Sequence, residues 1–265
     1  MHARKDSIPA SILASIRNRK KRLDAALAEA RPRAEGTLIA SYNVHKCVGA
    51  DRRFDPERTS RVIHEIDADL IALQEADTRF GERTGILDLA RLERETGLIP
   101  VPITGMAKAH GWHGNVVLFK KGLVRDVHQI KLPGLEPRGA LVAEIDLDET
   151  RTLRVIAAHL GLLRRSRSEQ ARVVLDIMSS QDERPTLLLG DLNEWRLGNR
   201  SALKTLHTTF ATPPAVPTFP SGLPVLALDR IMANRHGMVS SVEAHDTPLS
   251  RVASDHLPLT AFVSL

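Results

Sequence analysis

Cysteine and aromatic residues are scarce in this sequence, and their scarcity excludes several kinds of functional site. Cys47 is the one cysteine, so the chain has neither an intramolecular disulfide nor a cysteine-ligated zinc or iron–sulfur centre. A metal would have to bind to oxygen and nitrogen ligands. Aromatic residues make up 3% of the chain, which argues against an array of rings that stacks on several bases.

Long apolar runs are missing as well. No stretch approaches the roughly 20 apolar residues that span a bilayer. The basic run at residues 17–22 interrupts the apolar segment that a secretory signal requires. The composition, 42% hydrophobic and 26% charged, is typical of a globular protein. We therefore expect a soluble protein of a reducing compartment, the cytoplasm.

Positive charge is concentrated at the N-terminus. Residues 1–36 hold nine Lys or Arg and four Asp or Glu, whereas residues 37–265 hold 28 of each sign. The high pI of about 9.6 is thus a weak argument for nucleic-acid binding by the whole chain. Apolar residues spaced by four or seven within 8–30 predict a basic amphipathic helix, which packs on protein or contacts an anionic surface. We divide the chain into an N-terminal helical extension, 1–36, and a main domain, 37–265.

The main domain alternates short apolar strands with single helices. A strand is predicted over 37–43, a helix from Pro56 to about Ile66 with Asp55 as its N-cap, and a strand over 69–73. Later strands are predicted at 116–119, 140–145, 153–158, 187–189, 227–232, 239–244 and 259–263. Many strands with few helices indicate stacked sheets in an α/β sandwich. Residues 208–224, with five prolines, are predicted to form a long loop near the strand ends.

Five polar clusters follow predicted strands, where strand ends converge on one rim of a sheet. They are Ser-Tyr-Asn-Val-His at 41–45, Leu-Gln-Glu at 73–75, Ala-His-Leu at 158–160, Gly-Asp-Leu-Asn at 190–193 and Ser-Asp-His at 254–256. Each cluster alone has an ordinary explanation as a turn, a cap or a satisfied polar group. Together they supply the carboxylates, amides and imidazoles that a hard cation and an acid–base pair require.

At these residues the sequence resembles the endonuclease/exonuclease/phosphatase superfamily, whose members have the DNase I-like fold. The resemblance covers roughly residues 37–265 and depends chiefly on the Gly-Asp-Leu-Asn and Ser-Asp-His motifs. The positions that match the family in order are Asn43, Gln74, Glu75, His159, Asp191, Asn193, Asp229, Asp255 and His256. The resemblance implies a four-layer α/β sandwich, with two packed mixed β-sheets flanked by helices.

The resemblance also implies a hydrolase that uses Mg²⁺ or Mn²⁺. Glu75 would bind the metal directly, with Asn43 and Asp255 as further ligands. Oxygen ligands of this kind suit a hard divalent cation. The sequence leaves open whether one or two metal ions bind.

Five residues are implied as catalytic. His256 would deprotonate the attacking water and Asp229 would orient its imidazole, although the family pattern also allows Asp191 as the base. Asp191 and Asn193 would orient the water and a phosphate oxygen. His159 would stabilise the pentacovalent phosphorane or protonate the leaving oxygen.

Further residues are candidates for binding the substrate. Asn193, Asn115 and Arg164 are the expected contacts, and Arg164, Arg165 and Arg167 either grip a second phosphate or form a solvated basic segment. The residues after Glu75 and the histidine at position 159 differ from the residues at these positions in abasic-site endonucleases, which argues against abasic-site repair. We expect a phosphodiesterase or nuclease. A lipid or small-molecule phosphodiesterase or phosphatase, or a non-catalytic binding module, are the alternatives, and the oligomeric state stays open.

Overall fold

The computed structural model describes residues 36–179, 184–211 and 213–265. The helix expected within residues 8–30 lies outside the described residues. Within the described segments, no helix combines the length and the apolar character needed to cross a bilayer.

Two mixed sheets form the centre of the domain. The first has six strands in the order β10 (Val239–Ala244), β11 (Leu259–Val263), β1 (Thr37–Asn43), β2 (Leu70–Gln74), β4 (Val116–Phe119) and β3 (Ile99–Pro100). The second has five strands in the order β5 (Leu123–Leu132), β6 (Arg138–Asp146), β7 (Thr152–Ala158), β8 (Thr186–Asp191) and β9 (Asp229–Ala233). Each sheet contains one parallel pair, β1 with β2 and β7 with β8, among antiparallel neighbours.

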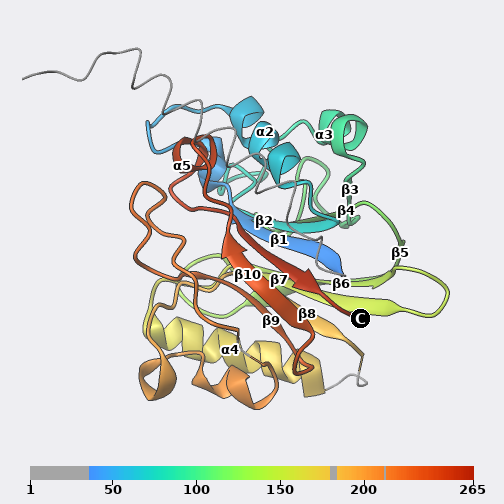
Figure 1. Ribbon diagram of the computed structural model, residues 1–265, viewed down its shortest axis with the longest axis vertical. Helices are drawn as coiled ribbons and strands as arrows, with labels where there is room; N and C mark the ends of the chain where they lie inside the picture. Colours follow the sequence, from blue (N-terminus) through green and yellow to red (C-terminus); the bar gives the residue numbers. More distant parts are fainter. Residues whose placement is uncertain (1–35, 180–183, 212) are drawn as a thin grey trace, which may run out of the picture. The chain divides into compact units, whose positions relative to one another are not determined.

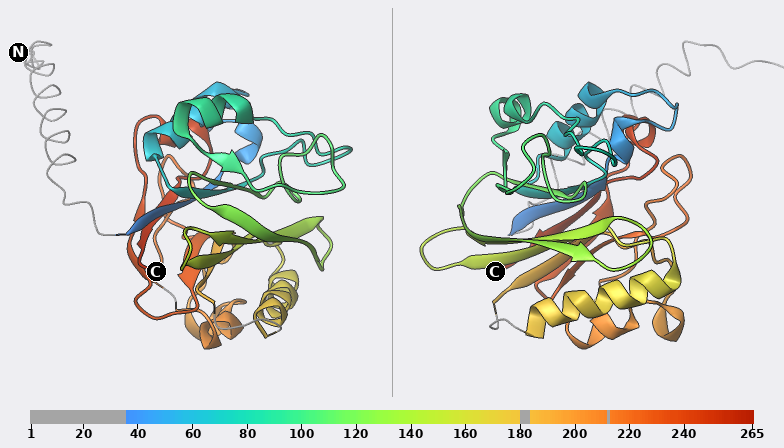
Figure 2. Two further views of the ribbon diagram at one scale, coloured as in Figure 1. Left: turned by 90° about the vertical axis from the view of Figure 1, so that its right-hand side faces the viewer. Right: turned by 180° about the vertical axis from the view of Figure 1, so that it is seen from behind.

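The sheets pack face to face and carry helices on their outer faces, as Figures 1 and 2 show. A buried apolar cluster between the sheets includes Ile39, Leu141 and Val155. A second cluster joins the first sheet to α2 (Pro56–Ile66) and α3 (Leu89–Thr96), and a third joins the second sheet to α4 (Arg164–Ser179). These layers confirm the four-layer α/β sandwich. Short helical turns complete the domain: η1 (His45–Cys47), η2 (Gly198–Arg200), η3 (Lys204–Thr208) and α5 (Ser250–Ala253).

Helix α2 begins and ends where its sequence predicts. The Asp55 side chain accepts a hydrogen bond from the Arg58 backbone N–H at 2.9 Å, and Pro56 occupies the first turn, where no N–H is needed. Val62, Ile63 and Ile66 are buried on one face, against the first sheet. The helix ends at Asp67, whose φ of +54° lies in the left-handed region that breaks a helix.

Strand pairing brings the polar clusters to one end of the sandwich. Asn43 pairs with Gln74 across the parallel strands β1 and β2, so Glu75 follows directly beside Asn43. Asp191 pairs with Asp229 across β8 and β9. Gly190 permits the close approach of β7 and β8, because a Cβ atom there would lie 1.8 Å from the Ala158 carbonyl oxygen.

Candidate active site

His256 and Asp229 form a buried pair at the centre of the site. Nδ1 of His256 lies 2.9 Å from Oδ2 of Asp229, and both side chains are almost fully buried. Thr218, from the long loop before β9, donates its hydroxyl to the same carboxylate oxygen at 2.5 Å. Burial opposes protonation of His256, but the negative charges of Asp229 and Asp191 outweigh it and raise its pKa to about 10.

Asp191 lies between the two histidines. Its Oδ2 is 3.7 Å from Nε2 of His256 and 3.4 Å from Nε2 of His159. Burial, together with the negative charge of Asp229, raises the pKa of Asp191 to about 6, against the opposing effect of His256. A carboxylate with this pKa can exchange a proton near neutral pH.

The two asparagines fix Asp191 and the strand ends around it. The Asn43 amide donates to Oδ2 of Asp191 at 3.0 Å, which links the first sheet to the second. The Asn193 backbone N–H donates to the other carboxylate oxygen at 2.9 Å, and its side-chain amide donates to the Leu160 carbonyl. Asn193 has a φ of +52°, a conformation that costs backbone energy and often occurs at functional sites.

His159 is held against a guanidinium group. Nη1 of Arg138 lies 2.8 Å from both ring nitrogens of His159, and Glu136 accepts two hydrogen bonds from the same guanidinium. Burial of the ring and the charge of Arg138 hold the pKa of His159 well below its usual range. His159 is therefore neutral, with its Nε2 side toward Asp191.

Glu75 lies at the end of β2, and its carboxylate forms an ion pair with Lys46. Nζ of Lys46 is 2.8 Å from Oε2 of Glu75. Burial opposes ionisation of Glu75, but the positive charge that His159 carries when it is protonated in acid and the hydrogen bond from Lys46 outweigh burial and lower the pKa of Glu75 to about 2. Glu75 itself and residues 45–47 all have positive φ, so strained backbone surrounds this ion pair.

The expected metal ligands bring oxygen donors to this end of the site. Glu75 offers an ionised carboxylate, and the Asn43 side-chain oxygen accepts one hydrogen bond, from the His45 backbone N–H. Asp255, whose side chain is 35% exposed, lies 3.6 Å from the His45 imidazole. No three His, Cys, Asp or Glu side chains of the described residues are grouped to hold a metal by themselves, so a bound cation would also need amide or water oxygens. The chemistry of these donors fits Mg²⁺ or Mn²⁺.

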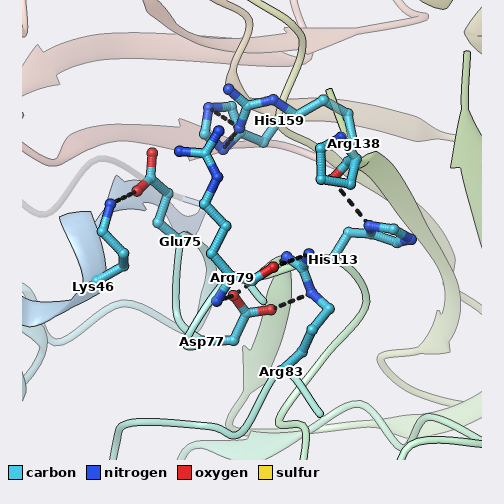
Figure 3. A pocket seen from close by; sticks show the side chains of 9 residues that line it. Lys46, Glu75, Asp77, Arg79, Arg83, His113, Arg138 and His159 are labelled. Atoms are coloured by element: carbon cyan, nitrogen blue, oxygen red, sulfur yellow. Dashed lines mark hydrogen bonds and ion pairs between the residues drawn. The ribbon is translucent and has the colours of Figure 1, made fainter. Parts of the chain in front are cut away.

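A pocket opens beside Glu75 and His159 (Figure 3). Its lining is rich in charged side chains: Lys46, Glu75, Asp77, Arg79, Arg83, His113, Pro137, Arg138 and His159. Burial lowers the pKa of His113, whose Nδ1 lies 3.0 Å from the Pro137 carbonyl oxygen.

Both alternatives for Arg167, a phosphate contact and a solvated basic segment, are wrong. Its side chain is 1% exposed, donates to the carbonyls of Gly161 and Leu162, and forms a buried ion pair with Glu194 at 3.4 Å. Arg167 is therefore a structural residue of the α4 region. Arg164 and Arg165 are exposed at the start of α4 and do not line the pocket.

Asn115 is fully buried and does not line the pocket. Its amide group donates to the carbonyls of Trp112 and Gly139, at 3.1 and 3.0 Å. Both hydrogen bonds hold the turn that carries His113, so contact of Asn115 with a substrate stays a prediction.

Several residues of the site escaped the sequence analysis. Thr218 was placed only within a loop, and Arg79 and Asp77 had no motif to mark them. Arg138 lies outside the five polar clusters. Their position in the sequence was the one signal that could have identified Asp77 and Arg79. They follow Glu75 by two and four residues, in the segment that continues directly from the end of β2.

Comparisons with known proteins show which family and fold the chain shares. The chain is 32% identical over 163 residues to the uncharacterised protein YbhP of Escherichia coli (strain K12). That match covers 58% of this chain and 64% of YbhP, just under two thirds of the relative.

Two solved structures share the fold at low sequence identity. A mannosyl-6-phosphatase, Bt3783 of Bacteroides thetaiotaomicron, has a TM-score of 0.67 at 14% identity and covers 86% of this chain and 100% of its own. D. rerio TDP2 in complex with a single-strand DNA product has a TM-score of 0.61 at 14% identity, with 88% and 100% covered. The sequence profile described as the Endonuclease/Exonuclease/phosphatase family matches residues 40–256, and the chain therefore belongs to that family.

Proposed function

We propose that the protein is a divalent-metal-dependent phosphoesterase that hydrolyses phosphodiesters with an activated water. The observation that carries the proposal is the arrangement of His256, Asp229 and Asp191. One ring nitrogen of His256 is 2.9 Å from Asp229, and the other lies 3.7 Å from Asp191. This is the base–orienter pair of acid–base hydrolysis, next to a second carboxylate that can hold a water.

In its neutral form, His256 would accept the proton of the attacking water at Nε2. Its pKa of about 10 keeps it protonated at neutral pH without a bound cation, and in that state Asp191 is the acceptor. The Nδ1–H of His256 donates to Asp229, which fixes the tautomer and stabilises the imidazolium that forms. Asp191, with a pKa of about 6, is a second acceptor 3.7 Å away, so a proton can be held by either group.

His159 and Arg138 face the leaving side of the reaction. Neutral His159 has one ring N–H, which can donate a hydrogen bond to a phosphate or leaving oxygen. The Arg138 guanidinium, 2.8 Å from the ring, adds positive charge beside the developing negative charge. The Asn193 amide, held by the Leu160 carbonyl, orients an oxygen near Asp191.

Glu75, Asn43 and Asp255 would hold Mg²⁺ or Mn²⁺. When bound, the cation would neutralise phosphate charge and lower the pKa of a nearby water and of His256. Lys46 compensates the charge of Glu75 at 2.8 Å in the structure and would yield that position to the cation.

The substrate is proposed to be a diester of nucleic acid, of a lipid or of a small molecule. One structural neighbour is named a phosphatase and another is bound to a DNA product, so the same fold supports phosphomonoester hydrolysis as the alternative. A non-catalytic binding role is less consistent with a site that keeps every acid–base residue in contact. A soluble, cytoplasmic location and contact of residues 1–36 with an anionic surface remain parts of this proposal.

The test is turnover of a substrate panel with Mg²⁺, with Mn²⁺ and with EDTA. The panel comprises plasmid DNA, single-stranded DNA, abasic duplex DNA, phospholipid vesicles, bis-p-nitrophenyl phosphate and p-nitrophenyl phosphate. We expect metal-dependent hydrolysis of bis-p-nitrophenyl phosphate that EDTA abolishes and that His256→Ala lowers. Folded protein without metal-dependent turnover of any panel member would contradict the proposal.

A further inference from the structure

The pocket beside Glu75 has an excess of positive charge. Its lining contains four basic residues, Lys46, Arg79, Arg83 and Arg138, but two carboxylates, Glu75 and Asp77. His113 and His159 also line the pocket, and both have lowered pKa values. The pocket therefore favours an anion, and the four basic side chains differ in how far they are free to bind one.

Three of the basic side chains already have partners. Lys46 forms the 2.8 Å ion pair with Glu75. Two nitrogens of the Arg83 guanidinium contact the Asp77 carboxylate, and a third donates to the Arg79 carbonyl at 2.8 Å. Arg138 contacts Glu136 and His159.

Arg79 is different. Among the described residues its guanidinium forms no ion pair and no hydrogen bond with a side chain, and its recorded contact is with the Phe80 ring, 5.6 Å from the centroid. Figure 3 shows the Arg79 side chain rising from its loop between Glu75 and Arg138, with the guanidinium toward His159. The positive charge of Arg79 contributes to the lowered pKa of His159, which agrees with this position.

The loop holds Arg79 in a strained turn. Its φ is +65°, and the Phe80 N–H donates to the Thr78 carbonyl at 2.8 Å, so Arg79 is the central residue of a γ-turn with positive φ. The Arg79 N–H donates to Asp77 at 2.7 Å, and Arg83 braces its carbonyl. Three hydrogen bonds thus fix the backbone around a residue whose own charge is left unpaired.

We propose that Arg79 binds a second phosphate of the substrate, one that is not hydrolysed. The inference rests on the proposed phosphoesterase function and names its substrate class: phosphodiesters with a further phosphate group next to the scissile one. The guanidinium is free to form a bidentate contact with phosphate oxygens.

The composition of the lining favours a second phosphate over the scissile one. Glu75 and His159 line the pocket together with Arg83, His113 and Pro137. Asp191, Asp229 and His256, which the proposed mechanism places around the attacking water, do not line it. A group bound at Arg79 is therefore displaced from the water-activating pair and sits beside the reaction.

Two chromogenic diesters with the same leaving group test the proposal. They are the p-nitrophenyl ester of thymidine 5′-phosphate and the same compound with an added 3′-phosphate. We expect the protein to prefer the 3′-phosphorylated compound in kcat/KM, and Arg79→Gln to reduce that preference roughly 10- to 100-fold, as for loss of a charged hydrogen-bonded contact. Arg79→Lys should keep part of it. Arg61→Gln, at an exposed position of α2, is the matched control and should keep all of it.

Binding supplies a readout that does not depend on turnover. Calorimetric titration with inorganic phosphate in EDTA should show binding by the wild-type protein and by Arg61→Gln, and weaker binding by Arg79→Gln. Hydrolysis of bis-p-nitrophenyl phosphate is measured in parallel. If Arg79→Gln still hydrolyses bis-p-nitrophenyl phosphate and keeps both the preference for the 3′-phosphorylated diester and the phosphate affinity of the wild type, the inference fails and the proposed function stands. An equal loss on both diesters would place Arg79 at the scissile phosphate and would also overturn the inference. If no diester is turned over but Arg79→Gln weakens phosphate binding, the proposed function fails and the anion site at Arg79 is supported.

Discussion

Nδ1 of His256 and the Thr218 hydroxyl both contact the same oxygen of Asp229, at 2.9 and 2.5 Å. The other carboxylate oxygen of Asp229 is buried and has no hydrogen-bond partner among the described residues. An ionised carboxylate that is buried with so few donors gains most of its stabilisation from the charge of a protonated His256. The negative charge of Asp229 therefore acts mainly on the histidine.

Replacing Asp229 with Asn is the direct test of this relationship. The amide keeps the shape and an acceptor oxygen but loses the charge, so the pKa of His256 should fall. Turnover should fall by roughly 10²–10⁴-fold, as for loss of a general base or its orienting partner. NMR titration of the His256 ring protons in the metal-free protein measures the pKa, and steady-state kinetics measures the rate.

The double variant Asp229→Asn/His256→Ala tests whether the two residues act together in turnover or contribute independently. Residues that act as a unit lose much less than the sum of their separate effects. Fully additive losses would show that Asp229 acts elsewhere, and a wild-type rate in His256→Ala would exclude the mechanism.

Glu75→Gln should weaken Mg²⁺ binding without unfolding the domain. The Glu75 carboxylate lies at the end of β2, and its side chain is 19% exposed. The substitution therefore removes a negative charge but keeps the packing of the side chain. Calorimetric Mg²⁺ titration measures the affinity, with Glu82→Gln as control because Glu82 is 69% exposed and pairs with Lys108. Equal affinity in wild type and Glu75→Gln would remove Glu75 from the metal ligands.

Most strands could be predicted from their apolar and β-branched residues, but two of the edge strands, β5 and β3, could not. The expected strands at 37–43, 116–119, 239–244 and 259–263 agree with β1, β4, β10 and β11. β5 (Leu123–Leu132) was missed because it lies at the edge of its sheet and contains charged, partly exposed residues instead of a simple alternation. β3 has two residues, too few for a pattern.

The site shows the same division between local motifs and tertiary contacts. Asp191 and Asp229 were identified singly, but their direct pairing across β8 and β9 depends on strand order, which the sequence did not reveal. Whether an arginine side chain is buried or exposed was harder to predict. Arg167 resembles Arg165 in sequence, yet burial next to Glu194 decides its role.

Arg167→Met should therefore destabilise the domain. It would remove the buried partner of the fully buried Glu194 and leave it the more exposed Arg196, 3.7 Å away, so we expect a loss of up to about 3–5 kcal/mol, the range for a broken buried pair. Arg165→Met on the same helix is the matched control, because Arg165 is 92% exposed and should change stability by about 0.5 kcal/mol or less. Urea unfolding of both variants provides the comparison. Equal stability of the two variants would show that the Arg167–Glu194 pair adds nothing.

Cys47 should be inert to thiol reagents in the folded protein. Its side chain is buried, and burial raises its pKa to about 11, so the reactive thiolate is nearly absent at pH 8. Titration with a disulfide reagent at pH 8 should report no rapidly reacting thiol in native protein and one per chain in urea. Rapid reaction of the native protein would show that the η1 turn opens.

Residues 1–36 carry the excess positive charge and none of the candidate site residues. The described domain has its own apolar clusters, and β1 begins at Thr37, so a chain shortened to 37–265 should keep its turnover of bis-p-nitrophenyl phosphate. Its activity on plasmid DNA or anionic vesicles should fall, and the salt dependence of that activity should flatten, because fewer counterions are released on binding. Both activities are measured over one salt series with full-length and shortened protein. Equal losses on small and large substrates, with an unchanged salt slope, would mean that residues 1–36 support folding and do not bind the substrate.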